Sequence, residues 1–438
     1  MSELTKYKPK LQYSITVTDL NGNVRKLNKL DIETIQYKES IGNIYPVLIL
    51  TTQVQGTSVL GSKYSFVGGE ELLVEIIVLS SENKIMWKMK DVFVVANLQL
   101  DFLTGDMKGM SRLIIKAIHK KMAVDLNNYK TVVYKKDSIN IGDYVKQLLD
   151  DVELKSYITP TKTFQKRYFR NLFNIEKRQT LNLLTKLSFM AIDKNDKGGF
   201  FFFGNKDKVY FATLIDIYAD FFINKKNRPP KKILDFFYKP YKMKWSFLRD
   251  PQNYYTQIKF YPAIRYQYDL LGFNHDIVSY DPFMNKLIHI KQDIQGNEEI
   301  WENDEQAEKN KKKIKFLGRY NIIGEKEKTR INRVFHSLQY PYQSRGIADF
   351  ISYYKNFTLF AKLTIKSIRN MDDYAIGDFI EIDVKGAQEE DTIYKGEYFV
   401  HSFNLTLHTY TNDFFVELEI AKSGLWKSLF NFVNVGEI

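Results

Sequence analysis

The sequence contains no cysteine, few histidines and no long apolar run. Without cysteine there can be no disulfides, thiolate zinc sites, iron–sulfur clusters or cysteine nucleophiles. The six histidines are scattered and include no pair at metalloprotease spacing, so we expect no metal site and no cofactor. No apolar run approaches the length that spans a bilayer, and residues 1–6 lack the apolar core of a secretion signal. We expect synthesis in the cytoplasm and no membrane insertion.

Motifs that support catalysis are also missing. Neither a Gly-x-Gly-x-x-Gly pattern nor a phosphate-binding loop occurs. Gly68-Gly69 and Gly198-Gly199 precede predicted strands, where turn formation explains them. The carboxylate pairs Glu70-Glu71 and Asp372-Asp373 fall in predicted turns. We therefore predict no catalytic, cofactor-binding or metal-binding residues and no enzymatic activity, although sequence does not reveal clefts.

Positive charge is in excess but not concentrated. The formal net charge is +12, with lysine and arginine spread over the whole length. The densest basic run, at 309–313, follows an acidic stretch and is typical of a solvated helix face. Nucleic-acid binding requires a focused basic face with exposed stacking aromatics, and here the aromatics lie in alternating strands. Nucleic-acid binding is therefore a weaker alternative.

Hydrophobic patterning predicts a mainly β chain with a helical insertion. Residues 9–125 alternate as strands do, for example at 11–17 before a turn at 19–23. Asn140 is placed to cap a helix with Val145, Leu148 and Leu149 on one face, and a second helix is predicted at about 178–190. A charged helix and loop at 300–325 and an apolar helical stripe at 425–433 are further expectations.

Four consecutive phenylalanines, Phe200 to Phe203, lie in a predicted hairpin spanning 196–211. Successive side chains of a strand point to opposite faces. Both faces of this strand must therefore be covered, by core on one side and a neighbouring domain or subunit on the other.

Two stretches, one near each end, are similar β-rich units. Gly69-Glu70-Glu71 followed by residues 90–100 and 111–116 corresponds to Gly377-Asp378-Phe379 followed by 396–407 and 414–420. An Asn-Leu-x-Leu run recurs at 97–100 and 404–407. Any half-buried strand alternates in this way, so two unrelated segments remain an alternative. A chain with two copies of one unit can build a ring with half as many subunits as positions.

The order of these motifs resembles the baseplate hub proteins of contractile-tailed bacteriophages. The residues that carry the resemblance are the helix followed by Gly198 to Phe203, the turn at Tyr280-Asp281-Pro282-Phe283, and the closing strands at 376–382, 396–400 and 418–420. The similarity covers most of the chain, but no single motif is diagnostic.

The resemblance implies an α+β, mainly β fold with two tube-like β-barrel domains of related fold and inserted α+β domains. The implied boundaries are a first barrel at 1–125, an inserted domain at 126–243 continued at 294–350, strands at 244–293 completing the second barrel, that barrel at 351–424, and a C-terminal tail at 425–438. The segments near 215–243 and 300–325 have no clear family counterpart.

The resemblance also implies a function and partners. The chain would be a homotrimeric structural protein of the virion, assembled in the host cytoplasm. Its pseudo-sixfold ring would adapt a hexameric tail tube above to a separate trimeric spike below, with baseplate wedge components as further partners. Phage DNA would pass through the lumen without specific binding. Alternatives are a tail-tube-like or tube-closing virion component, a nucleic-acid-binding protein, and a cell-envelope hydrolase, for which no acid–base pair stands out.

Overall fold

The computed structural model describes most of both ends of the chain and part of its middle. The described residues are 10–27, 32–55, 66–80, 82–102, 110–127, 130–131, 140–159, 177–178, 180–191, 193–194, 199–205, 208–214, 216–217, 220, 231–237, 246–247, 254–262, 275–281, 286–292, 298–301, 357–367, 374–385, 396–411 and 413–423. The expected helices at 300–325 and 425–433 lie outside them, apart from the strand residues at 300 and 301.

The N-terminal part is a β unit. Its strands are β1 (Lys10–Thr18), β2 (Val24–Lys26), β3 (Ile32–Ser40), β4 (Val47–Gln55), β5 (Glu71–Leu79), β6 (Ile85–Phe102) and β7 (Met110–His119). The alternation predicted from sequence is present: in β1, Ile15 and Val17 are buried and their neighbours are not. The predicted turn follows, where the Asp19 carboxylate accepts hydrogen bonds from the backbone amides of Asn21 and Asn23.

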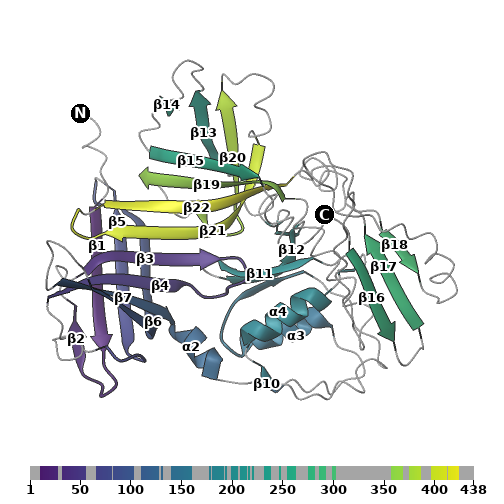
Figure 1. Cartoon of the computed structure of the whole chain (residues 1–438), viewed down its shortest axis with the longest axis horizontal. Helices are drawn as coiled ribbons and strands as arrows, with labels where there is room; N and C mark the ends of the chain where they lie inside the picture. Colours follow the sequence, from purple (N-terminus) through teal and green to yellow (C-terminus); the bar gives the residue numbers. More distant parts are fainter. Residues whose placement is uncertain are drawn as a thin grey trace.

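An α+β insertion follows the first unit. Its elements are α2 (Lys120–Asn127), β8 (Lys130–Thr131), α3 (Ile141–Asp150), β9 (Ser156–Ile158), β10 (Lys177–Arg178), α4 (Thr180–Met190), β11 (Phe200–Asn205) and β12 (Lys208–Thr213). The predicted cap of α3 is confirmed, since the Asn140 side chain accepts a hydrogen bond from the Gly142 amide. Figure 1 shows α3 and α4 side by side, next to β11 and β12.

The phenylalanine strand β11 is covered on both faces, as predicted. Phe201 and Phe203 belong to the large core of the β units, whereas Phe200 and Phe202 belong to a second core with α3 and α4. All four side chains are buried. Two-sided burial explains why an unbroken aromatic run is stable here: each face supplies an apolar partner.

The C-terminal part contains a second β unit and a separate small sheet. The unit's strands are β13 (Lys231–Phe237), β14 (Ser246–Phe247), β15 (Tyr254–Pro262), β19 (Phe357–Ser367), β20 (Phe379–Lys385), β21 (Gly396–His408) and β22 (Asp413–Ser423). The separate sheet comprises β16 (His275–Asp281), β17 (Lys286–Gln292) and β18 (Glu298–Trp301). Residues 282–285 of the expected turn after Tyr280 lie outside the described residues, and the flanking strands β16 and β17 pair antiparallel, with Asp281 opposite Lys286.

The two β units repeat one strand order. The first runs β1-β5-β6-β7-β4-β3, and the second runs β13-β20-β21-β22-β19-β15. The mainly β fold with two related units and an α+β insertion is thus present. The domain boundaries given above stay predictions.

Residue-level equivalence between the units follows from their turns and bulges. Gly69 and Val95 bond through their backbones, as do Gly377 and Val400. In both long strands a bulge comes next, at Ala96 in β6 and at His401 in β21. Val95 is therefore equivalent to Val400.

The recurring Asn-Leu-x-Leu runs are not structurally equivalent. Counting from the shared bulge, Asn97 matches Ser402, and Asn404 matches Gln99. The runs are displaced by two residues, a shift that keeps every side chain on the same face.

Candidate assembly interface

Strand β21 connects the two units into one sheet. Along one edge it pairs with β22. Along the other edge, residues 396–399 pair with β20 of the same unit, and residues 402–408 pair antiparallel with β3 of the first unit. The change of partner coincides with the bulge at His401. Figure 1 shows β21 (yellow) lying beside β3 (purple). We call the β3–β21 pairing the in-chain joint.

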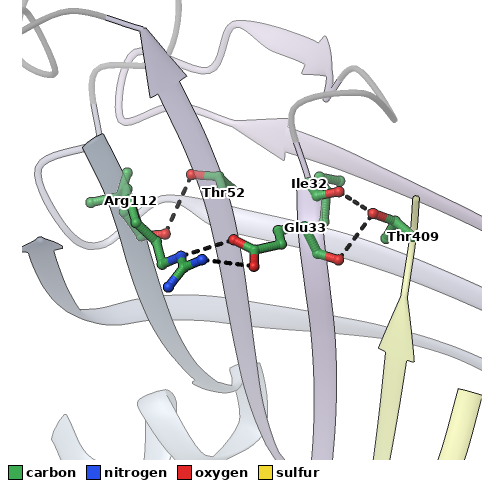
Figure 2. A network of polar contacts seen from close by, with 6 residues as sticks. Ile32, Glu33, Thr52, Arg112 and Thr409 are labelled. Carbon is green, nitrogen blue, oxygen red and sulfur yellow. Dashed lines mark hydrogen bonds and ion pairs between the residues drawn. The ribbon is translucent and has the colours of Figure 1, made fainter. Parts of the chain in front are cut away.

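A polar network closes one end of the in-chain joint (Figure 2). The Thr409 hydroxyl donates to the backbone oxygens of Ile32 and Glu33, and the Thr409 amide donates to the Glu33 oxygen at 3.1 Å. The Glu33 carboxylate accepts two bonds from the Arg112 guanidinium on β7, at 2.8 and 2.9 Å. Glu33 thus joins the second unit through its backbone and the first through its side chain.

Aromatic packing crosses the same joint on its buried face. Tyr37 on β3 contacts Phe403 on β21 edge to face, with ring centroids 6.5 Å apart, and Trp87 of its own unit at 5.8 Å. The Tyr37 hydroxyl donates to the Glu39 carboxylate at 2.6 Å. Burial, with the nearby Glu39 charge, raises the pKa of Tyr37 well above its usual value.

The inserted domain attaches at the other end of the joint. The Ile41 amide donates to the His401 oxygen at 3.1 Å, and the Gly42 amide donates to the Phe202 oxygen of β11 at 2.9 Å. Gly204 allows β11 to approach this turn closely, because a side chain at this position would collide with the Ile44 backbone. The β3–β4 turn therefore holds both the second unit and the insertion.

His401, at the bulge, is a partly buried histidine. Burial lowers its pKa to about 4, so it is neutral at physiological pH. Its ring packs edge to face with Phe360, with centroids 6.4 Å apart. It is one of the six scattered histidines, and its backbone oxygen rather than its ring takes part in the joint.

A cavity of about 430 Å³ lies between the first unit and the insertion, lined by residues that include Tyr45, Asp91 and His119. The His119 ring stacks on Tyr45, and its Nε2 is 3.3 Å from the Asp91 carboxylate. The described residues that line the cavity include no serine, threonine or cysteine. No metal-ligand cluster is found among the described residues.

The other residues singled out from sequence are structural or undescribed. The Glu70 carboxylate accepts bonds from the amides of Val67 and Gly68, at 2.6 and 3.0 Å, and stabilises the predicted turn. Asp372-Asp373 lies outside the described residues. The joint residues Glu33, Arg112 and Thr409 were not expected, because backbone acceptors leave no mark in a sequence.

No family model and no curated protein matches the chain. Among solved structures, the tail protein from Neisseria meningitidis MC58 matches with a TM-score of 0.50 at 9% identity, covering 94% of this chain and 98% of that one. The chain has the fold of a tail protein. The resemblance to phage tail proteins is thereby confirmed at the level of fold.

Two further solved structures are similar at lower scores. The 43 kDa tail protein of prophage MuSo2 from Shewanella oneidensis has a TM-score of 0.46 at 9% identity, covering 93% of this chain and 97% of that one. An E. coli type VI secretion component, described as similar to T4 bacteriophage tail proteins gp27 and gp5, scores 0.39 at 9% identity, with coverages of 95% and 77%.

No helix among the described residues has the length and apolar character to cross a membrane.

Proposed function

We propose that this chain is a structural virion protein, the hub of a contractile-tail baseplate, in which three copies form a ring of six β units. The observation that carries the proposal is the repeated strand order combined with the in-chain joint. Two similar units already pair edge to edge within one chain. Repeating the same pairing between chains closes a ring in which similar units alternate.

The proposed ring has two symmetries at once, which suits an adaptor. Six similar β units offer pseudo-sixfold contacts to a hexameric tail tube. The insertion from α2 to β12 occurs once per chain, between the two units, so three chains present it three times. A threefold set of insertions matches a separate trimeric spike, and wedge components are further candidate partners.

Two ion pairs on the joined sheet bear on what could pass through the proposed ring. On the polar face of the joined sheet, Arg112 pairs with Glu33 and Lys362 pairs with Glu417, at 2.8 and 2.9 Å. These two cations are paired within the sheet and are less free to bind phosphates, which favours passage of DNA without specific binding. Assembly would take place in the host cytoplasm before incorporation into the virion.

The oligomeric mass tests the proposal. Native mass spectrometry and multi-angle light scattering of the purified chain, alone and with its spike, should give three copies. Rings seen by electron microscopy should have six similar lobes and three protrusions. A chain that stays monomeric in every complex, or forms a ring of six copies, would contradict the proposal.

A further inference from the structure

Two of the open strand edges in the described part of the chain belong to β6 and β15. Among the described strands, β6 pairs with β5 only up to the bulge, so residues 97–102 have a described strand partner on the β7 side alone. Strand β15 pairs with β19 on one side, and no described strand pairs with its other side. Open edges carry backbone donors and acceptors that can bind another strand.

These two edges are the counterparts of the in-chain joint. Strand β6 is equivalent to β21 through the shared bulge. Strand β15 is equivalent to β3. In the first unit β3 pairs with β4, which pairs with β7, and in the second β15 pairs with β19, which pairs with β22. The registers are the same, so that Tyr37 matches Phe260. Strands β6 and β15 are therefore the counterparts of β21 and β3, and among the described residues they are not paired with each other.

Side-chain burial differs at these equivalent positions. At the in-chain joint, Ile35 and Tyr37 of β3 and Phe403 and Leu405 of β21 are buried. Their four counterparts are only partly buried and pack at the margin of the same core; they are Ile258, Phe260, Leu98 and Leu100. The apolar positions are kept at the open edges, but their cover is incomplete.

We infer that β6 of one subunit pairs antiparallel with β15 of a second copy of this chain, in the register of the in-chain joint. Leu405 lies opposite Tyr37 in the chain, which places Leu100 opposite Phe260 between chains. Thr406 lies opposite Gln36, which places Asp101 opposite Lys259. This inference rests on the proposed function and specifies its subunit contact.

Charge complementarity supports a second copy as the occupant. The in-chain pair Thr406–Gln36 is neutral, whereas its counterpart combines a carboxylate with an ammonium group. Opposite charges directly across an antiparallel pair stabilise it, and like charges oppose it. The Asp101 carboxylate is already oriented by a 3.0 Å bond from the Gln99 side chain, and Lys259 is exposed.

Cysteine pairing tests the register directly, because the chain has no cysteine of its own. With an added oxidant, Asp101→Cys with Lys259→Cys should give disulfide-linked dimers and trimers on a non-reducing gel. The matched control is Gln36→Cys with Thr406→Cys at the in-chain joint, which should form a disulfide within one chain and leave its mass unchanged.

Charge reversal gives an independent measurement. Asp101→Lys or Lys259→Asp alone should raise the trimer dissociation constant by about tenfold or more, and the two together should restore it. Circular dichroism melting would establish that each variant folds. A wild-type trimer whose cysteine pair does not cross-link, and whose charge reversals change nothing, would overturn this pairing while the trimeric hub stands. A wild-type chain that is strictly monomeric and does not cross-link would overturn both.

Discussion

The two β units differ at their outer strand and agree at the joint. In the first unit β1 runs antiparallel to β5, whereas in the second β13 runs parallel to β20. The bulge is nevertheless at the same position in β6 and β21. The comparison teaches that strand direction can vary far from the joint, whereas register is kept where the units meet.

The units also differ in what contacts the glycine that precedes β5 in the first unit and β20 in the second. Gly69 and Gly377 are equivalent, and both have positive φ, +92° and +83°. Next to Gly69 lies Leu20, at an exposed turn, whereas next to Gly377 lies the buried ring of Phe203 from the insertion. The insertion is therefore attached to the second unit at a point where the first unit faces solvent.

Removing the ring at this contact should have the largest effect. Phe203→Ala should lower the free energy of unfolding by about 3–5 kcal/mol, because it leaves a cavity among Tyr210, Phe399 and Gly377. Leu20→Ala at the matching position of the first unit should change it by less than about 0.5 kcal/mol, since Leu20 is 66% exposed. Denaturant unfolding followed by circular dichroism measures both, and equal effects would refute the asymmetry.

The glycines themselves should differ next. Gly377→Ala should cost about 3 kcal/mol, because positive φ and collision with the Phe203 ring add together. Gly69→Ala should cost about 1–2 kcal/mol, since its close neighbour among the described residues is the flexible tip of Leu20, at 3.2 Å.

A double-mutant cycle isolates the steric part. With Phe203→Ala in place, Gly377→Ala should lose its collision. The double variant should then be destabilised by less than the sum of the two single variants, by about 1 kcal/mol or more. Strict additivity would mean that the ring and the glycine do not interact.

The bulge residues predict a difference in pH dependence. The unfolded chain binds a proton at His401 near its ordinary pKa of 6.5, while the folded chain holds that pKa at about 4. Stability from neutral His401 is therefore present above pH 6.5 and is lost as the pH falls towards 4. The loss between pH 7.5 and pH 5 should be about 2 kcal/mol.

His401→Gln should remove that part of the pH dependence. Unfolding free energies measured across this range would decide, and an unchanged slope in His401→Gln would contradict the assignment.

The smallest expected effect is at the ion pairs on the polar face. Arg112→Met removes a two-bond pair with Glu33 and should cost about 1 kcal/mol, with loosening of the joint end near Thr409. Lys362→Met removes a single contact with Glu417 and should cost about 0.5 kcal/mol or less. Both costs should shrink in high salt, and salt-independent costs would point to packing instead.

The local structure could be predicted because its causes are local. Strand alternation, the Asn140 cap and the two-sided burial of Phe200 to Phe203 follow from residue type and spacing. The duplication was also visible, but its register was not. Since side chains alternate with a period of two, a displacement of two residues leaves the hydrophobic pattern unchanged, and only the bulge fixes the equivalence.

The joint was beyond sequence reasoning for a different reason. Thr409 and Ile32 are 377 residues apart and meet through a backbone oxygen that any residue carries. Which strands share an edge depends on how the whole chain closes, not on the composition of either strand. The open edges of β6 and β15 likewise could not be predicted from sequence, because they are recognised by their equivalence to the paired strands β21 and β3.

The same separation affects synthesis on the ribosome. At about 5–20 residues per second, the chain segment that pairs with β3 emerges roughly 20–75 s after β3 itself. During that interval the edge of β3 is a vacant template for any complementary strand. Neighbouring ribosomes on one message present the β21 strands of older chains to the β3 strands of younger ones, so a joint completed in trans would interlock two polypeptides. Translation speed across the insertion thus bears on whether the sheet closes within one molecule or between two.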